Sequence, residues 1–120
     1  MQFTSSVIKG SGRGKTIGFP TLNLDMQNVP QEMEPGVYAC KAKIDGSEYS
    51  AAMHYGARPT TDDTPSCEIH VIDNDIDEPP ESVSVEVIQK LRDIEDFGSL
   101  DGLREQLQSD IDEARAILSA

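Results

Sequence analysis

The sequence predicts a mainly β protein, in which five or six short antiparallel strands form a small barrel and one C-terminal helix covers its end. Two observations predict this fold class. Short runs of β-branched, aromatic and small residues alternate with polar residues as far as Leu91. The period of the apolar residues changes to three or four only after Ser99. Strands that precede a single helix are typical of a sheet whose edges are closed by a barrel.

Residues 36–53 are the clearest structural unit in the sequence. The first arm of this unit alternates, with two lysines on one face and four small or apolar residues on the other: Tyr38, Cys40, Ala42 and Ile44. Asp45-Gly46 follows, and this dipeptide is a strong signal for a two-residue hairpin turn. We therefore expect an antiparallel pair over residues 36–44 and 47–53.

Three further segments have the β-branched character of short strands, namely 3–8, 67–72 and 83–91. The stretch between the last two is a polar loop, since consecutive prolines cannot lie inside a sheet. The cysteines, Cys40 and Cys67, fall in expected strand interiors, where we predict buried, reduced thiols.

The segment after Ser99 is predicted to be an amphipathic helix. Its apolar stripe recurs every three or four residues and consists of Leu100, Leu103, Leu107, Ile111, Ala114 and Leu118. Ser99 is the candidate N-cap, and Asp101 is an acidic residue near the positive end of the helix.

Length and charge restrict the function classes. A chain of 120 residues has room for one domain, residues 1–120. Its net charge of -12 argues against a nucleic-acid surface, which needs clustered positive charge. No apolar stretch resembles a signal peptide or a membrane span. We therefore expect a cytoplasmic monomer with neither nucleic acid nor a membrane as its partner.

The segment from Lys9 to Asn23 is rich in residues that can bind an anion or a metal ion. It holds four of the nine glycines, which let backbone amides approach a ligand, and three of the ten basic residues: Lys9, Arg13 and Lys15. The hydroxyl of Thr21 and the amide of Asn23 offer oxygen atoms to a hard cation. A phosphate group with a divalent metal satisfies all of these groups, although the glycines alone would fit a flexible turn.

Two familiar phosphate-binding motifs are excluded by spacing. A Walker A loop that ends at Gly14-Lys15-Thr16 needs its first glycine at Lys9, and Gly10 is one residue too close. The dinucleotide fingerprint would place its third glycine at Lys15. The residues that follow, Ile17 to Pro20, also resist the helix that a P-loop requires.

Five blocks in the sequence resemble riboflavin kinases in order and spacing. They are GSGRGKTIGFPTLN at 10–23, PGVYA at 35–39, YGARPT at 55–60, CEIHVID at 67–73, and the pattern from Leu91 to Asp110. The resemblance implies a small six-stranded antiparallel β-barrel with a C-terminal α-helix. It also implies an enzyme that phosphorylates the 5'-hydroxyl of riboflavin with ATP, to give FMN and ADP.

The resemblance assigns roles by position. Glu68 is expected to be the catalytic carboxylate and Arg92 to belong to the loop that closes over the flavin. Thr21 and Asn23 would coordinate Mg²⁺, with Zn²⁺ as a possible substitute. The residues expected to bind the nucleotide are Gly12, Arg13, Gly14, Lys15, Gly18, Pro20 and Thr21.

The pattern alone leaves plainer roles open. Glu68 alternates with the apolar residues of its strand and could be a solvated residue on the outer face. Arg92 could pair with Asp93 or Asp96 at the surface. Thr21 and Asn23 could stabilise a turn, and the histidines at positions 54 and 70 fit surface or hydrogen-bonded polar residues better than metal ligands.

Several positions depart from the family pattern, and in one block His54-Tyr55-Gly56 stands where Asn-Ile-Gly is usual. This change falls on the flavin side of the expected site. It motivates a second hypothesis, a non-catalytic flavin or nucleotide-binding module on the same barrel.

Overall fold

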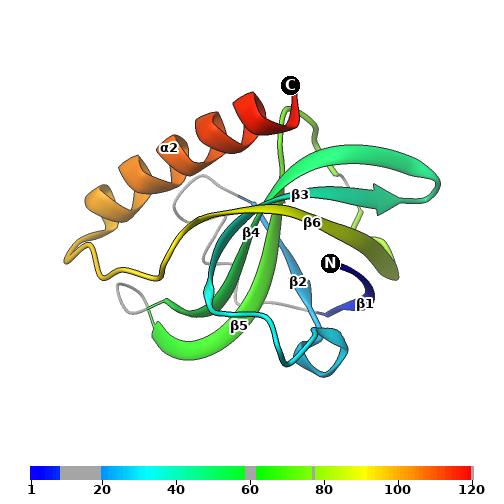
Figure 1. Ribbon diagram of the computed structural model, residues 1–120, viewed down its shortest axis with the longest axis horizontal. Coiled ribbons are helices and arrows are strands. Elements are labelled where there is room, and N and C mark those ends of the chain that lie inside the picture. Colours follow the sequence, from blue (N-terminus) through cyan, green and yellow to red (C-terminus); the bar gives the residue numbers. More distant parts are fainter. Residues whose placement is uncertain (9–19, 59–61, 77, 120) are drawn as a thin grey trace.

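The computed structural model describes residues 1–8, 20–58, 62–76 and 78–119 (Figure 1). In these residues six strands close into a barrel in the order β1-β2-β5-β4-β3-β6, and all neighbours are antiparallel. The strands are β1 (Gln2–Ile8), β2 (Leu22–Leu24), β3 (Gly36–Ile44), β4 (Ser47–Arg58), β5 (Asp62–Val71) and β6 (Ser82–Arg92). A 3-10 turn, η1 (Met26–Asn28), follows β2, and the helix α2 (Leu100–Leu118) ends the fold. The predicted fold class is confirmed.

The hairpin of β3 and β4 forms as the sequence predicts. Both turn residues have positive φ, 50° at Asp45 and 86° at Gly46, as a two-residue turn of this type requires. The predicted apolar face of β3 lies inside the barrel, where it joins residues of β2, β5 and β6 in one cluster. The strand β4 continues to Arg58, five residues beyond the predicted end at Met53.

The strand β2 was not predicted from the sequence. Its three residues are too few to show alternation, and its pairing with β1 and β5 makes it a strand. Leu22 and Leu24 point into the barrel core. The same pairing fixes Asn23 on the opposite, outer face.

The helix α2 begins as predicted, with the Ser99 side chain accepting a hydrogen bond from the Gly102 amide at 3.1 Å. We expected the helix to cover an end of the barrel. It lies instead along the outer wall (Figure 1). Ala39 and Ala52, register partners on β3 and β4, face outward there and pack with Ile111 and Ala114. These small residues let the helix approach the sheet, which explains its position.

Enlarging Ala39 should separate the helix from the wall. Its side chain is 0% exposed beneath α2, so we expect Ala39→Leu to lower the free energy of unfolding by about 1–3 kcal/mol, the usual cost of overpacking. Urea denaturation followed by circular dichroism measures this. The control is Lys43→Leu, on the same strand but exposed. Equal unfolding midpoints for both variants would contradict the packing described.

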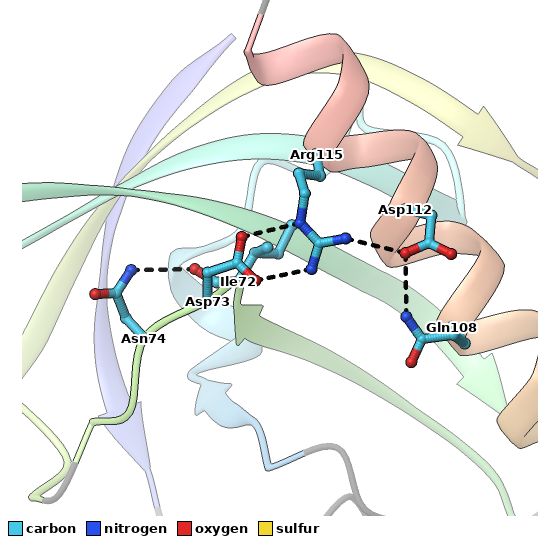
Figure 2. Close-up of polar contacts among 6 residues, drawn as sticks. All are labelled: Ile72, Asp73, Asn74, Gln108, Asp112 and Arg115. Atoms are coloured by element: carbon cyan, nitrogen blue, oxygen red, sulfur yellow. Dashed lines mark hydrogen bonds and ion pairs between the residues drawn. The ribbon is translucent and has the colours of Figure 1, made fainter.

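The C-terminal half of α2 is tied to the loop after β5 by an exposed ion pair (Figure 2). Arg115 donates from Nε and Nη2 to the two carboxylate oxygens of Asp73, at 2.9 and 2.8 Å. Its Nη1 donates to Asp112 Oδ1 at 3.0 Å, and Gln108 donates to the same oxygen at 3.1 Å. This network anchors the C-terminal end of the helix, the end opposite its N-cap.

The ion pair with Arg115 should make stability depend on acid pH. The hydrogen bond from Arg115 lowers the pKa of Asp73 below its ordinary value of 3.8. A lowered folded-state pKa stabilises the fold above pH 3.8, and this contribution is lost as the pH falls through the lower value. We expect Asp73→Asn to flatten the acid limb of a plot of melting temperature against pH. An unchanged limb would contradict this prediction.

Candidate active site

The strand register brings three of the predicted site residues, Arg92, Glu68 and Asn23, into one row across five strands. Arg92 of β6 is opposite Val37 of β3, and Val37 is opposite His54 of β4. His54 is opposite Glu68 of β5, and Glu68 is opposite Asn23 of β2. Residues directly opposite each other on neighbouring strands project from the same face of a sheet. We call this set the cross-strand row.

The cross-strand row lies on the outer face of the barrel, because the neighbours of Glu68 on β5, Cys67 and Ile69, belong to the interior cluster. A pocket of about 370 Å³, including its open mouth, lies between this face and α2. The strands and the residue before β2 contribute Thr21, Val37, Ala52, Met53, His54, Glu68 and His70. The helix contributes Leu107, Asp110 and Ile111.

Glu68 faces outward, as the alternation of β5 predicts, but it is not solvated. Its exposure is only 7%, and α2 and Thr21 line the pocket around it. The Thr21 hydroxyl donates to Oε1 at 3.0 Å, and the Ser66 hydroxyl donates to Oε2 at 3.0 Å. Two hydroxyl groups therefore hold the carboxylate in a fixed orientation.

The oxygen atoms around Glu68 suit a hard cation. Because the Thr21 proton is directed at Glu68, the lone pairs of Thr21 Oγ1 remain for another partner. Asn23 is half-buried on the same outer face, opposite Glu68. Within the described part of the chain no group of three or more His, Cys, Asp and Glu side chains could hold a metal ion. Mg²⁺, which takes few protein ligands and keeps water or phosphate oxygens, fits this donor set.

Pro20, which follows the last glycine of the segment from Lys9 to Asn23, is held against the barrel wall. His70 Nδ1 lies 2.8 Å from the Pro20 carbonyl oxygen, and since a carbonyl only accepts, the ring nitrogen donates. This contact fixes the backbone next to Thr21. The other predicted nucleotide-binding residues, Gly12, Arg13, Gly14, Lys15 and Gly18, lie outside the described residues.

Arg92 forms a buried ion pair with the helix. Its Nε donates to Asp110 Oδ1 at 2.9 Å, and its Nη2 donates to Asp110 Oδ2 at 2.9 Å. The Arg92 side chain is 14% exposed and the Asp110 side chain is 2% exposed. Its Nη1 donates to the backbone carbonyl of Asp93 at 3.0 Å, and its guanidinium carbon lies 5.1 Å from the centre of the Phe97 ring. The carboxylate partner is therefore neither Asp93 nor Asp96, the two surface partners considered from sequence.

The thiol next to Glu68 takes no part in ionic chemistry. Burial in the barrel raises the pKa of Cys67 to about 12, and the Glu68 charge adds to this effect. Cys40 is also buried, and both cysteines are free, as the sequence predicts. The Cys67 thiol therefore stays protonated at neutral pH and cannot accept a proton there.

Four polar residues of the site have no functional role assigned from the sequence: His54, Ser66, His70 and Asp110. His54 is 7% exposed and lines the pocket rather than the surface. The signal for Asp110 was present, since it lies three residues after Leu107 and seven after Leu103, on the apolar stripe of the helix. A lone acid on such a stripe indicates a buried partner.

Comparison with known proteins identifies the family. The family model described as "Flavokinase: Riboflavin kinase" matches residues 1–118. The chain belongs to the riboflavin kinase family. It is 33% identical over 112 residues to the bifunctional riboflavin kinase/FMN adenylyltransferase of Bacillus subtilis, covering 90% of this chain and 35% of that protein. It is 35% identical over 106 residues to the trifunctional protein RibF/MnmA of Mycoplasmoides gallisepticum, covering 88% of this chain and 16% of that protein.

Two further similarities concern the predicted absence of a nucleic-acid partner and the predicted fold. A B. subtilis relative called RNA-binding riboflavin kinase RibR is 30% identical over 108 residues, which cover 88% of this chain and 46% of that protein. The crystal structure of a macrolide-efflux protein from Streptococcus pneumoniae matches with a TM-score of 0.81 and 30% identity, over 95% of this chain and 38% of that one. The chain thus spans less than half the length of these riboflavin kinase relatives.

The partner predictions are tested only in part. No helix in the described ranges is long and apolar enough to cross a membrane. The expected absence of a nucleic-acid partner stays a prediction, as do the cytoplasmic location and the monomeric state.

Proposed function

We propose that the chain transfers the γ-phosphoryl group of ATP to the 5'-hydroxyl of riboflavin, giving FMN and ADP. The observation that carries the proposal is the cross-strand row, which aligns Arg92, Glu68 and Asn23 on one outer face. Its ends are four strands apart, a path of about 19 Å along the curved outer wall of the closed barrel. The row can therefore serve a flavin at its Arg92 end and a phosphate at its Asn23 end. Membership of the riboflavin kinase family supports the same assignment.

Glu68 is the proposed proton acceptor. In the reaction the 5'-oxygen forms a bond to the γ-phosphorus while the bond from that phosphorus to the ADP oxygen breaks. An alcohol is a weaker acid than a carboxylic acid, so the proton passes to Glu68 late, as the new bond forms. The hydroxyls of Thr21 and Ser66 hold the carboxylate in the orientation that this transfer needs.

The phosphate end combines the metal-binding and nucleotide-binding predictions. Thr21 and Asn23 would hold Mg²⁺, which supplies neutralisation of the charge on the phosphates. The glycine-rich segment, with Gly12, Arg13, Gly14, Lys15 and Gly18, would hold the phosphates through backbone amides and positive charge. The His70 contact to Pro20 supports this end by fixing the chain next to Thr21.

The flavin end has an apolar wall. Val37 and Ala52 of the sheet and Leu107 and Ile111 of the helix line the pocket. Apolar side chains with a few placed polar groups are the usual lining of a site for a flat aromatic ligand. This composition fits the ring system of a flavin better than a second phosphate.

The deciding experiment incubates the chain with riboflavin, ATP and Mg²⁺ and measures FMN by chromatography. We expect FMN to accumulate in proportion to enzyme and to require the metal. The second candidate is a non-catalytic flavin or nucleotide-binding module. It is favoured by His54, which departs from the family pattern and lies next to Glu68 in the cross-strand row. Riboflavin binding without FMN would support the module and contradict the kinase.

A further inference from the structure

We propose that Asp110 is a positioning residue, which holds Arg92 in the orientation that binds the flavin. The proposal rests on the function proposed above. Asp110 lines the pocket from α2, and Arg92 lies at the end of the cross-strand row, opposite the pocket residue Val37. The ion pair therefore joins the helix to the sheet at the flavin end of the pocket.

Both carboxylate oxygens of Asp110 are used to orient the guanidinium. Oδ1 accepts from Arg92 Nε at 2.9 Å and from Gln106 Nε2 at 3.0 Å. Oδ2 accepts from Arg92 Nη2 at 2.9 Å and from Nε at 3.2 Å. A two-point contact between a planar guanidinium and a carboxylate fixes rotation as well as position.

The remaining contacts of Arg92 leave part of the guanidinium for a ligand. Its donors to Asp110 and to the Asp93 carbonyl account for three of its five N–H groups within the described residues. Phe97 lies against the guanidinium, with its ring centre at 5.1 Å. The other N–H groups are held at a defined place next to the pocket, which suits recognition of the carbonyl oxygens of a flavin ring.

Anchoring the helix does not require this buried pair. α2 already has apolar contacts with β3 and β4, and the exposed Asp73–Arg115 pair holds its other half (Figure 2). A buried ion pair adds little net stability, because removing two charges from water offsets most of their attraction. Orientation of Arg92 is the effect that an apolar pair could not supply.

The test is a double-mutant cycle on riboflavin recognition. The variants are Asp110→Asn, Arg92→Gln and the double variant, in which no unpaired buried charge remains. Each is titrated with riboflavin by quenching of flavin fluorescence, and KM values for riboflavin and for ATP are measured separately. Asp73→Asn, which breaks the exposed pair on the same helix, is the matched control.

We expect Asp110→Asn to raise the Kd and KM for riboflavin roughly tenfold or more, with the KM for ATP changed less than about twofold. In the Arg92→Gln background the same substitution should add almost nothing. Unchanged riboflavin affinity, equal losses for both substrates, or full additivity in the cycle would each overturn the proposal. A wild-type chain that binds riboflavin but makes no FMN would overturn the kinase function alone, since the binding titrations still test Asp110.

Discussion

Replacing Glu68 with glutamine is expected to lower kcat for FMN formation by roughly 10²–10⁴-fold, the usual contribution of a positioned acid or base. Glutamine keeps the size of the side chain. Its carbonyl oxygen can accept from one of the two hydroxyl donors of Glu68, Thr21 and Ser66, while its NH2 group donates to the hydroxyl oxygen of the other. It cannot take the proton of the substrate hydroxyl. The KM for ATP should change little, because Glu68 contacts the acceptor and not the phosphates in this proposal.

The control for Glu68→Gln is Glu86→Gln, the same change at an exposed position of β6. It should leave kcat, both KM values and the melting temperature unchanged. Steady-state kinetics with chromatography of FMN, and calorimetric titration with an ATP analogue, separate turnover from nucleotide binding. A Glu68→Gln enzyme with full kcat would remove the carboxylate from the mechanism.

The parts of the fold that could be predicted are those with local signals. The β3–β4 hairpin follows from alternation and from Asp45-Gly46, and α2 follows from its N-cap and apolar period. The strand β2 has no such signal, because three residues become a strand only by pairing with β1 and β5. The position of α2 also depends on tertiary packing, since it follows from outward alanines on two strands that a helix far along the chain must meet.

The site shows the same division between local and long-range information. Alternation correctly places Glu68 on the outer face of β5, but that pattern alone fits a solvated side chain. Burial comes from α2, whose Leu107 and Ile111 close the pocket about forty residues later. The ion-pair partner of Arg92 could not be predicted from the sequence either. Asp93 and Asp96 are the acidic residues near it in the chain, and only the packing of the helix brings Asp110 into contact with it.

Replacing Thr21 with valine tests the phosphate end of the site. Valine keeps the branched shape but removes the hydroxyl that donates to Glu68 Oε1 at 3.0 Å. We expect kcat to fall roughly 10–100-fold and the Mg²⁺ concentration for half-maximal rate to rise by a similar factor, as when a partner of a metal site is lost. Loss of a hydrogen bond to a charged group should also lower the free energy of unfolding by about 1.5 kcal/mol.

The conservative variant Thr21→Ser separates the hydroxyl from the methyl group. Serine can donate to Glu68 and keep its lone pairs for a cation, so it should retain most of the rate and the ordinary Mg²⁺ requirement. Mg²⁺ titrations of initial rate on the wild type and both variants provide the comparison. If Thr21→Val has normal Mg²⁺ dependence and only reduced stability, Thr21 orients Glu68 but does not contribute to the metal site.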